Sequence, residues 1–431
     1  MSREYGSGSG SGRVPVIAWI LAVACLLRVA AVVVRFENLQ VDRDDYHDIA
    51  QNLLSGHGYC STPGQPTAYR PPLYPFVVAA CNYAGGASVL GAVQILLGTA
   101  TVWLTWHLAG RCQLSRRTAA IAATLVAIDP LLIEYTTQAM TETLSTFLVT
   151  MLLAATLWDG NEIAKSARVG LLFGLAALCR PSIWAFGATA GAVWVVKNGR
   201  GCLGDDVFIS RTCSRHLKVG IVCLAAVAMT VSPWVIRNSM VFGRPILMTT
   251  HGGYTLLLGN NETFFNEVVM GGAPWRALSL SGWQSENERH LSAIGISSTD
   301  EVSRDAELSR MAKQWILSNP MKFVQSCSLR VQRFWACQPS VSTDIPTWLI
   351  QGGRVYYLGA FVLAAVGFIC CIRMWLKYWT IPTMVVALVL VHSVYWSNAR
   401  MRSAIVPVIA LATAAAFQRP LYRQNSSSCI E

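Results

Sequence analysis

Acidic residues are concentrated in one polar stretch near the start of the chain, residues 37–75, which separates two apolar segments. Four aspartates lie within seven residues of one another, namely Asp42, Asp44, Asp45 and Asp48. Carboxylates this close together are costly beside hydrocarbon unless they face water or take part in chemistry. Arg70 follows in the same stretch. These residue types indicate a wet site where carboxylates accept protons and a guanidinium binds an anion.

The first aspartate stands just before a predicted short helix. Residues 44–56 have apolar side chains at helical spacing, and Gly56 ends the pattern. Asp42 would therefore lie near the amide-rich end of this helix. Two interpretations stay open: Asp42 or Asp44 caps the helix while the other acids are solvated, or a carboxylate here does chemistry.

A second set of charged residues stands at the ends of later apolar segments. Glu142 begins one such segment, and Arg180 and Arg237 each follow one, next to Pro181 and Asn238. Arginines are disfavoured on the outer side of a membrane, so they need a reason there, and an anionic lipid headgroup is the natural one. The structural alternatives are that Arg70 is a snorkelling anchor and that Glu142 interacts with a helix dipole.

Two polar residues stand in a glycine-rich stretch after the seventh apolar segment. His251 and Asn260 could line an acceptor site, and His251 could bind a metal, but an ordinary polar loop fits equally because no second ligand is near at metal spacing. Arg28 lies within the first apolar segment and is expected to face the bundle interior or to snorkel. His392 is expected to be a satisfied buried histidine.

Composition identifies a multi-spanning membrane protein. Of the 431 residues, 53% are hydrophobic and 13% are charged, and the mean hydropathy is +0.42. Soluble proteins carry about 25% charged residues. The net charge of +11 comes mostly from short links between apolar runs, which is how topology is encoded in bilayers. Nucleic acid is therefore not expected as a partner.

The predicted fold is all-α with about ten transmembrane helices. The candidate spans are residues 14–34, 89–109, 118–135, 140–158, 169–178 extended at both ends, 183–196, 219–236, 355–374, 379–396 and 404–417. A shorter apolar run, 73–84, is predicted to lie in the interface without crossing. The basic links then all fall on one side, which the positive-inside rule makes the cytoplasm, together with both termini.

Charge and hydropathy also predict the domain organisation. Its parts are a flexible tail at 1–13, a catalytic membrane module at 14–236 with a first outer loop at 36–88, an extracytoplasmic cap at 237–353, further membrane helices at 354–418 and a cytoplasmic tail at 419–431. Within the cap, residues 300–317 are predicted to form a helix that Asn319 and Pro320 end. Residues 279–298 read as loop. Cys327 and Cys337 could pair in an oxidising compartment.

The ordered motifs resemble one family of membrane enzymes. Asp42 four residues before Tyr46, with residues 56–59 (Gly-His-Gly-Tyr), looks like the first-loop signature of the polytopic GT-C glycosyltransferases. The similarity is greatest to the PMT-like clan, which contains protein O-mannosyltransferases and lipid A aminoarabinose transferases. It continues through residues 70–75, 129–130, 141–142, 174–181 and 233–238, and it covers roughly 14–261.

The resemblance implies an inverting glycosyltransferase in the plasma (inner) membrane. It would use a polyprenyl-phosphate sugar donor and a lipid, glycan or protein acceptor on the extracytoplasmic face. It implies Asp42 as the first-loop catalytic aspartate, Glu142 as an acidic site residue and Arg70 as a basic residue near the donor phosphate. The residue types themselves lead us to expect Asp42 as the general base, Asp45 as a further catalytic acid, and Arg237 and Arg180 as further donor phosphate ligands. Many members carry an acid directly after the first-loop aspartate, where this chain has Arg43. A divalent metal therefore stays open, as does Asp44 or Asp45 as a substitute ligand.

Two other classes of function remain as alternatives. A polytopic transporter or lipid flippase would make no bond, and it would place ionisable groups at mid-membrane, usually with internal repeats and broken helices. This sequence has no visible repeat, and its acids cluster at one surface. A noncatalytic scaffold with an outer cap that binds partners would tolerate the loss of all the outer acids.

Overall fold

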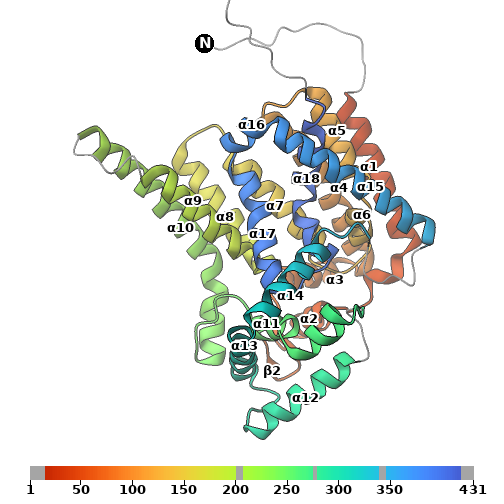
Figure 1. The fold of residues 1–431 in the computed structure, drawn as a ribbon, viewed down its shortest axis with the longest axis vertical. Helices are drawn as coiled ribbons and strands as arrows, with labels where there is room; N and C mark the ends of the chain where they lie inside the picture. The colour runs from red at the N-terminus through yellow and green to blue at the C-terminus, as the bar shows by residue number, and fades with distance from the viewer. Residues whose placement is uncertain (1–14, 200–206, 275–278, 339–345, 419–431) are drawn as a thin grey trace, which may run out of the picture.

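The fold is known from a computed structural model that describes residues 15–199, 207–274, 279–338 and 346–418. These residues form helices almost throughout (Figure 1). The small exception is the hairpin of β1 (Cys60–Thr62) and β2 (Gln65–Pro66) in the first outer loop, which pairs antiparallel. The predicted tails at 1–13 and 419–431 lie outside the described residues.

Four helices are long and apolar enough to cross a bilayer: α1 (Val16–Val34), α4 (Ala87–Arg111), α10 (Val207–Phe242, from Ser214 onward) and α15 (Thr347–Cys370). A fifth span arises if the bent pair α5 (Arg116–Ala127) and α6 (Pro130–Thr136) is counted as one. The chain is thus a multi-pass membrane protein, while the full number of ten spans stays a prediction.

The remaining predicted spans correspond to shorter helices: α7 (Glu142–Thr156), α8 (Glu162–Cys179), α9 (Ile183–Gly199), α17 (Thr380–Val394) and α18 (Val406–Ala415). The interfacial run is α3 (Leu73–Ala84). Its 12 residues reach only about 18 Å along the axis, which is short of the roughly 30 Å hydrocarbon layer. This length suits the predicted position in the interface.

A buried arginine explains the bend between α5 and α6. The guanidinium of Arg28 on α1 is fully buried and donates to the carbonyl oxygens of Val126 and Ala127 at the end of α5. The peptide groups freed at the break are further satisfied by Asp129, whose carboxylate accepts from the amide of Leu132 (2.9 Å) and caps α6. Arg28 therefore faces the bundle interior, one of the two positions expected from the sequence.

Small residues let the C-terminal helices pack closely. A Cβ atom at Gly367 of α15 would lie 1.9 Å from the carbonyl oxygen of Ala412 on α18, so only glycine fits there. The largest buried apolar cluster draws residues from α3, α4, α7, α8, α17 and α18. The N-terminal and C-terminal parts of the chain therefore share one core.

The basic links meet at one end of the bundle. Lys377, at the end of α16 (Ile372–Lys377), donates to Gln113 after α4 (3.1 Å), and Gln418 after α18 accepts from Thr118 at the start of α5 (2.8 Å). Figure 1 places α16 and the start of α5 at the upper end. These contacts agree with the prediction that the links share one side, although Arg419 and Arg423 lie outside the described residues.

The two predicted outer segments meet at the opposite end, where Figure 1 shows α2, α11, α12 and α13. The first contains η1 (Phe36–Leu39) and α2 (Tyr46–Leu54). The second contains α11 (Gly252–Gly259), the π-helix η3 (Phe264–Met270), α12 (Ser279–Ala293), α13 (Glu301–Ser318) and α14 (Pro320–Phe334). The helix predicted at 300–317 is confirmed as α13, with Asp300 as its cap.

Two expectations for the second outer segment are corrected. Residues 279–298 are largely the helix α12 instead of a loop, because Trp283 and Leu291 lie eight residues apart on one face and pack against α11 and α13. With so few apolar residues, the helical period is not visible in the sequence. Cys327 and Cys337 are both free thiols, and Cys327 instead contacts the guanidinium of Arg330 on the next turn (3.3 Å).

Candidate functional site

Asp42 lies beside the start of α2, as predicted. One carboxylate oxygen accepts from the amide of Tyr46 and the other from the amide of Asp48, both at 2.9 Å. These are first-turn amides, which have no partner within the helix. The residue is exposed, so its carboxylate is accessible from solvent. The capping alternative is therefore realised by Asp42, and it holds the carboxylate in a fixed orientation.

The next two aspartates turn towards Arg70. One oxygen of Asp44 lies 3.1 Å from the Arg70 guanidinium, and Asp45 lies at 3.8 Å from the same group. Asp45 has a left-handed backbone (φ 59°), which L residues adopt at a cost and which is often retained where a site needs it. Burial raises the pKa of Asp45 above its usual value, although Arg70 opposes the shift.

Glu142 is the most deeply buried acid of the site. It begins α7 with no exposed surface, and one of its oxygens lies 2.6 Å from Arg400 Nε and 3.4 Å from Arg180 Nη2. Its other oxygen is buried without a hydrogen-bond partner among the described residues. Two guanidiniums thus approach one oxygen of Glu142 and leave the other available.

These pairs join into one continuous cluster, in which Arg400 also lies 3.3 Å from the second oxygen of Asp44. The order of contact is Arg70, Asp44, Arg400, Glu142 and Arg180. Three guanidiniums therefore surround two carboxylates, with Asp45 at the rim. The guanidiniums offer planar sets of N–H donors that suit an anion with several oxygens, such as a phosphate.

Arg400 is a residue that the sequence interpretation missed. It lies in the 3₁₀ segment η4 (Ala399–Ile405), directly before α18. Its side chain is 26% exposed, against 16% for Arg70 and 12% for Arg180, so it is the most accessible guanidinium of the cluster. The same argument that singled out Arg70 could have found it, since Arg400 and Arg402 also stand at the outer end of an apolar segment.

The backbone before Arg70 is clamped from two sides. The hydroxyl of Tyr59 donates to the carbonyl oxygen of Arg70 (2.9 Å). Glu301 of α13 accepts from the amide of Ala68 (2.5 Å) and from the hydroxyl of Thr67 (2.8 Å). A carboxylate from the cap thus fixes the segment that carries the first cation of the cluster.

Arg237 makes none of the contacts that build the cluster. It donates to the carbonyl oxygens of Thr67 (2.7 Å) and Tyr59 (2.6 Å), from a helix that continues to Phe242 instead of ending near Ile236. The structure therefore gives Arg237 a role in holding the first outer loop to α10. Its predicted role as a phosphate ligand stays a prediction.

Asn260 is also placed away from the cluster. Its amide donates to the carbonyl oxygens of Leu256 (2.7 Å) and Val394 (2.9 Å), and its oxygen accepts from buried Arg330 (3.1 Å). With both ends of the amide satisfied by the fold, Asn260 ties α11 to the end of α17. Its predicted place at an acceptor site stays a prediction.

His251 lies beside the clamped loop. Its ring packs edge-on against Tyr69 (4.2 Å between centroids) and stacks on Tyr254 (5.4 Å). Burial, with the charge of Arg70, lowers the pKa of His251 well below its usual value, so the imidazole is neutral. Its Nδ1 atom is buried without a partner among the residues described. A polar wall next to Tyr69 and Arg70 fits the acceptor side that was predicted.

The residues present do not suit a divalent cation. No group of three or more His, Cys, Asp or Glu side chains is placed to hold a metal within the described parts of the chain. Hard cations need several oxygen ligands, whereas here Arg400 contacts both Asp44 and Glu142. The carboxylates of the cluster therefore bind guanidinium groups.

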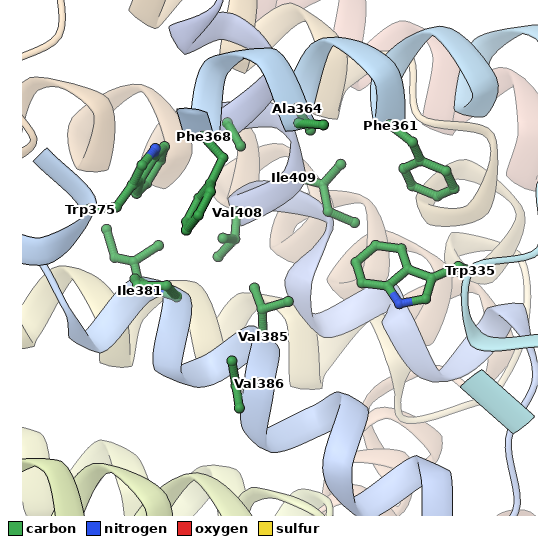
Figure 2. A pocket seen from close by; sticks show the side chains of 13 residues that line it. Trp335, Phe361, Ala364, Phe368, Trp375, Ile381, Val385, Val386, Val408 and Ile409 are labelled. Atoms are coloured by element: carbon green, nitrogen blue, oxygen red, sulfur yellow. The ribbon is translucent and has the colours of Figure 1, made fainter. Parts of the chain in front are cut away.

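An apolar cavity of about 490 Å³ lies between α15, α17 and α18. Figure 2 shows Trp335 and Phe361 at one end, Phe368 and Trp375 at the other, and Val408 and Ile409 between them. The other lining residues are Ala364, Ala365, Ile381, Pro382, Val385, Val386 and Ala412. Such a lining suits a hydrocarbon chain.

The segment η4 connects this cavity to the cluster. Arg402, two residues after Arg400, lies over the rings of Tyr357 (4.2 Å) and Phe361 (5.4 Å), and Phe361 lines the cavity. Arg402 also donates to the carbonyl oxygens on either side of Trp335, those of Phe334 and Ala336. One short stretch of chain thus carries a cluster cation and borders the aromatic end of the cavity.

Comparison with known proteins agrees with this architecture. Residues 69–236 match the family model described as dolichyl-phosphate-mannose-protein mannosyltransferase. No curated protein matches the sequence significantly. The resemblance to GT-C glycosyltransferases of the PMT-like clan is therefore confirmed over the matched residues.

Solved structures of an archaeal oligosaccharyltransferase show the same type of fold. The apo oligosaccharyltransferase of Archaeoglobus fulgidus is 15% identical over 92% of this chain and 50% of its own, with a TM-score of 0.50. The same protein, tethered with an acceptor peptide that contains the NVT sequon, is 14% identical over 92% of this chain and 49% of its own, with a TM-score of 0.50. ArnT from Cupriavidus metallidurans, bound to undecaprenyl phosphate, is 15% identical over 94% of this chain and 78% of its own, with a TM-score of 0.44. The chain spans about half the length of the oligosaccharyltransferase.

Proposed function

We propose that this protein is a membrane glycosyltransferase that moves a sugar from a polyprenyl-phosphate donor to an acceptor on the extracytoplasmic face. The observation that carries the proposal is the cluster in which Arg70, Arg180 and Arg400 surround Asp44 and Glu142. A family model named for a dolichyl-phosphate-linked sugar matches the part of the chain that contributes Arg70, Glu142 and Arg180. The acceptor is a lipid, a glycan or a protein.

The donor would lie across the cluster and the apolar cavity. Its phosphate would contact Arg70 and Arg400, the two guanidiniums that share Asp44. Its prenyl chain would enter the cavity beside Trp335 and Phe361, because burial of apolar surface stabilises binding by about 25 cal/mol per Å². The segment formed by η4 and the start of α18 would then contact the phosphate at one end and the prenyl chain at the other.

The chemistry suits these residue types. Loss of a phosphate from an anomeric carbon passes through an oxocarbenium-like state, and guanidiniums stabilise the charge that develops on the leaving phosphate. A carboxylate must take the proton of the attacking acceptor group. Asp42 fits this role because its carboxylate is exposed and held only by neutral amides. Asp44 is engaged by two guanidiniums, and we assign it to positioning them. A single displacement inverts the anomeric centre.

The sidedness of the reaction follows from charge. The basic links contact one another at one end of the bundle, and the cluster draws on loops from the other. By the positive-inside rule the linked end would face the cytoplasm, which supports the proposal that the cluster works on the extracytoplasmic side of the plasma (inner) membrane. About ten spans, with Arg237 holding the outer loop and His251 lining the acceptor side, complete the proposal.

The test is sugar transfer by the purified full chain in lipid nanodiscs. A panel of undecaprenyl-phosphate sugars is supplied, and release of undecaprenyl phosphate is followed by mass spectrometry. We expect Asp42→Asn to lower the rate by at least about 100-fold while the protein still binds undecaprenyl phosphate. The control is Asp48→Asn, which changes an exposed acid on the same loop. Full activity of Asp42→Asn would contradict the assignment of Asp42 as the general base. Movement of a solute or lipid without bond formation would favour a transporter.

A further inference from the structure

We propose that Arg400 stands where a divalent cation would otherwise bridge the two acids, so that the reaction proceeds on guanidinium charge without a metal. This inference rests on the proposed transfer from a prenyl phosphate. It concerns which groups stabilise the negative charge on the leaving phosphate. The fold alone does not decide between a metal ion and arginine side chains.

The position of Arg400 carries the argument. Its Nε lies 2.6 Å from Glu142 Oε1, and its Nη2 lies 3.3 Å from Asp44 Oδ2. A side chain that reaches both carboxylates at these distances occupies the point where a cation shared by the two acids would have to sit. Arg400 cannot lose its charge at physiological pH, so it repels a second cation from the same point.

The remaining oxygens cannot form a coordination shell. Asp44 Oδ1 is held by Arg70 (3.1 Å), and Glu142 Oε1 is shared with Arg180 (3.4 Å). Both oxygens of Asp42 accept from backbone amides. Of the four oxygens of Asp44 and Glu142, this leaves Glu142 Oε2 as the one without a hydrogen-bond or ion-pair contact in the described structure. Magnesium is usually held by one or two carboxylates together with water and substrate phosphate, and here Arg400 already contacts both carboxylates that such an ion would share.

Guanidiniums can do the work of a metal at this step. As the bond between the anomeric carbon and the donor oxygen breaks, its electron pair goes to the phosphate, while the acceptor oxygen forms the new bond and gives its proton to Asp42. Arg400 is the most exposed of the three cations and offers several N–H donors in a plane that matches phosphate oxygens. Arg70 Nε is a further buried donor with no partner in the described structure.

The experiment measures metal binding and prenyl-phosphate binding separately, on the full chain in nanodiscs. Mn²⁺ is titrated and followed by electron paramagnetic resonance, which reports bound ion without any turnover. Undecaprenyl phosphate affinity is measured after exhaustive chelation and again with added Mg²⁺ or Mn²⁺. We expect no Mn²⁺ site at the acids and affinities that agree within about twofold with and without cation.

Variants connect these readings to Arg400. Arg400→Gln is expected to weaken undecaprenyl phosphate binding by at least about tenfold, and Arg400→Lys, which keeps the charge but not the planar fork, by less. Arg43→Gln, an exposed arginine in the first outer loop, is the matched control. Because Arg400→Gln could impair folding, the wild-type Mn²⁺ titration stands as an independent measurement.

The outcomes separate this inference from the proposed function. Tight Mn²⁺ binding that Glu142→Gln removes, or prenyl-phosphate binding that is lost on chelation and restored by Mg²⁺, would overturn the role given to Arg400 and leave the transferase intact. A chain that binds no prenyl phosphate with or without cation would overturn both.

Discussion

Arg400 Nε lies 2.6 Å from an oxygen of Glu142, and this contact joins the start of α7 to η4, the segment before the last helix of the bundle. Glu142 has no exposed surface, so the pair is withdrawn from most of the solvent that would weaken it. The site is therefore complete only when the C-terminal helices are packed against the N-terminal ones. Truncation before residue 399 would remove one of its three cations.

Removing the charge of Glu142 should destabilise the site. Glu142→Gln leaves Arg180 without its carboxylate and Arg400 with only Asp44, and breaking a buried pair typically costs about 3 kcal/mol. We expect a lower Tm in detergent and loss of transfer. Glu162→Gln is the control, since its pair with Arg215 is exposed and such pairs contribute little. Equal thermal unfolding of the two variants would show that the buried pair does not stabilise the fold.

The carboxylate of Glu301 should control the order of the loop before Arg70. Glu301→Ala leaves the amide of Ala68 and the hydroxyl of Thr67 without their partner, a loss of about 1–3 kcal/mol. We expect faster hydrogen exchange over residues 59–70 and weaker prenyl-phosphate binding, with unchanged exchange in α4. Glu288→Ala removes an exposed acid of the same cap and should leave the loop unaffected. If both variants exchange alike, the clamp is not formed in solution.

His251 should make stability fall at mildly acidic pH. Its pKa is lowered in the folded state, so below the unfolded value of about 6.5 the unfolded chain binds a proton that the folded chain does not. Stability is full above that pH and decreases as the pH falls towards the folded pKa. His251→Phe keeps the ring packing and removes the proton, so its Tm should drop about 1–2 °C less than that of the wild type between pH 7.5 and 5.5. His57→Gln, at an exposed histidine, should behave as wild type.

The apolar cavity should discriminate prenyl phosphates by chain length. Ala364→Phe places a ring in the cavity between α15, α17 and α18. We expect about tenfold weaker binding of undecaprenyl phosphate and unchanged binding of geranyl phosphate, whose short chain need not enter. The control is Leu358→Phe, at an exposed position of the same helix. Equal losses for both lipids would place the chain elsewhere.

The local elements were largely predictable from the sequence. The interfacial run at 73–84, the short helix after Asp45 and the cap helix α13 appear where periodicity and capping residues indicate them. Membrane character follows from composition, because each apolar segment must be buried in lipid or protein. Helix α12 was missed because two apolar residues eight positions apart give too little amphipathic signal.

The identity of the site depended on tertiary structure. Asp42, Glu142, Arg70 and Arg180 were singled out from the sequence, but only the packing of η4 against α7 brings Arg400 to Asp44 and Glu142. Packing also decided that Arg237 and Asn260 satisfy backbone carbonyl groups. The physical reason is range: hydropathy and capping act between near neighbours along the chain, whereas ion pairs and cavities form between side chains that only the folded chain brings together.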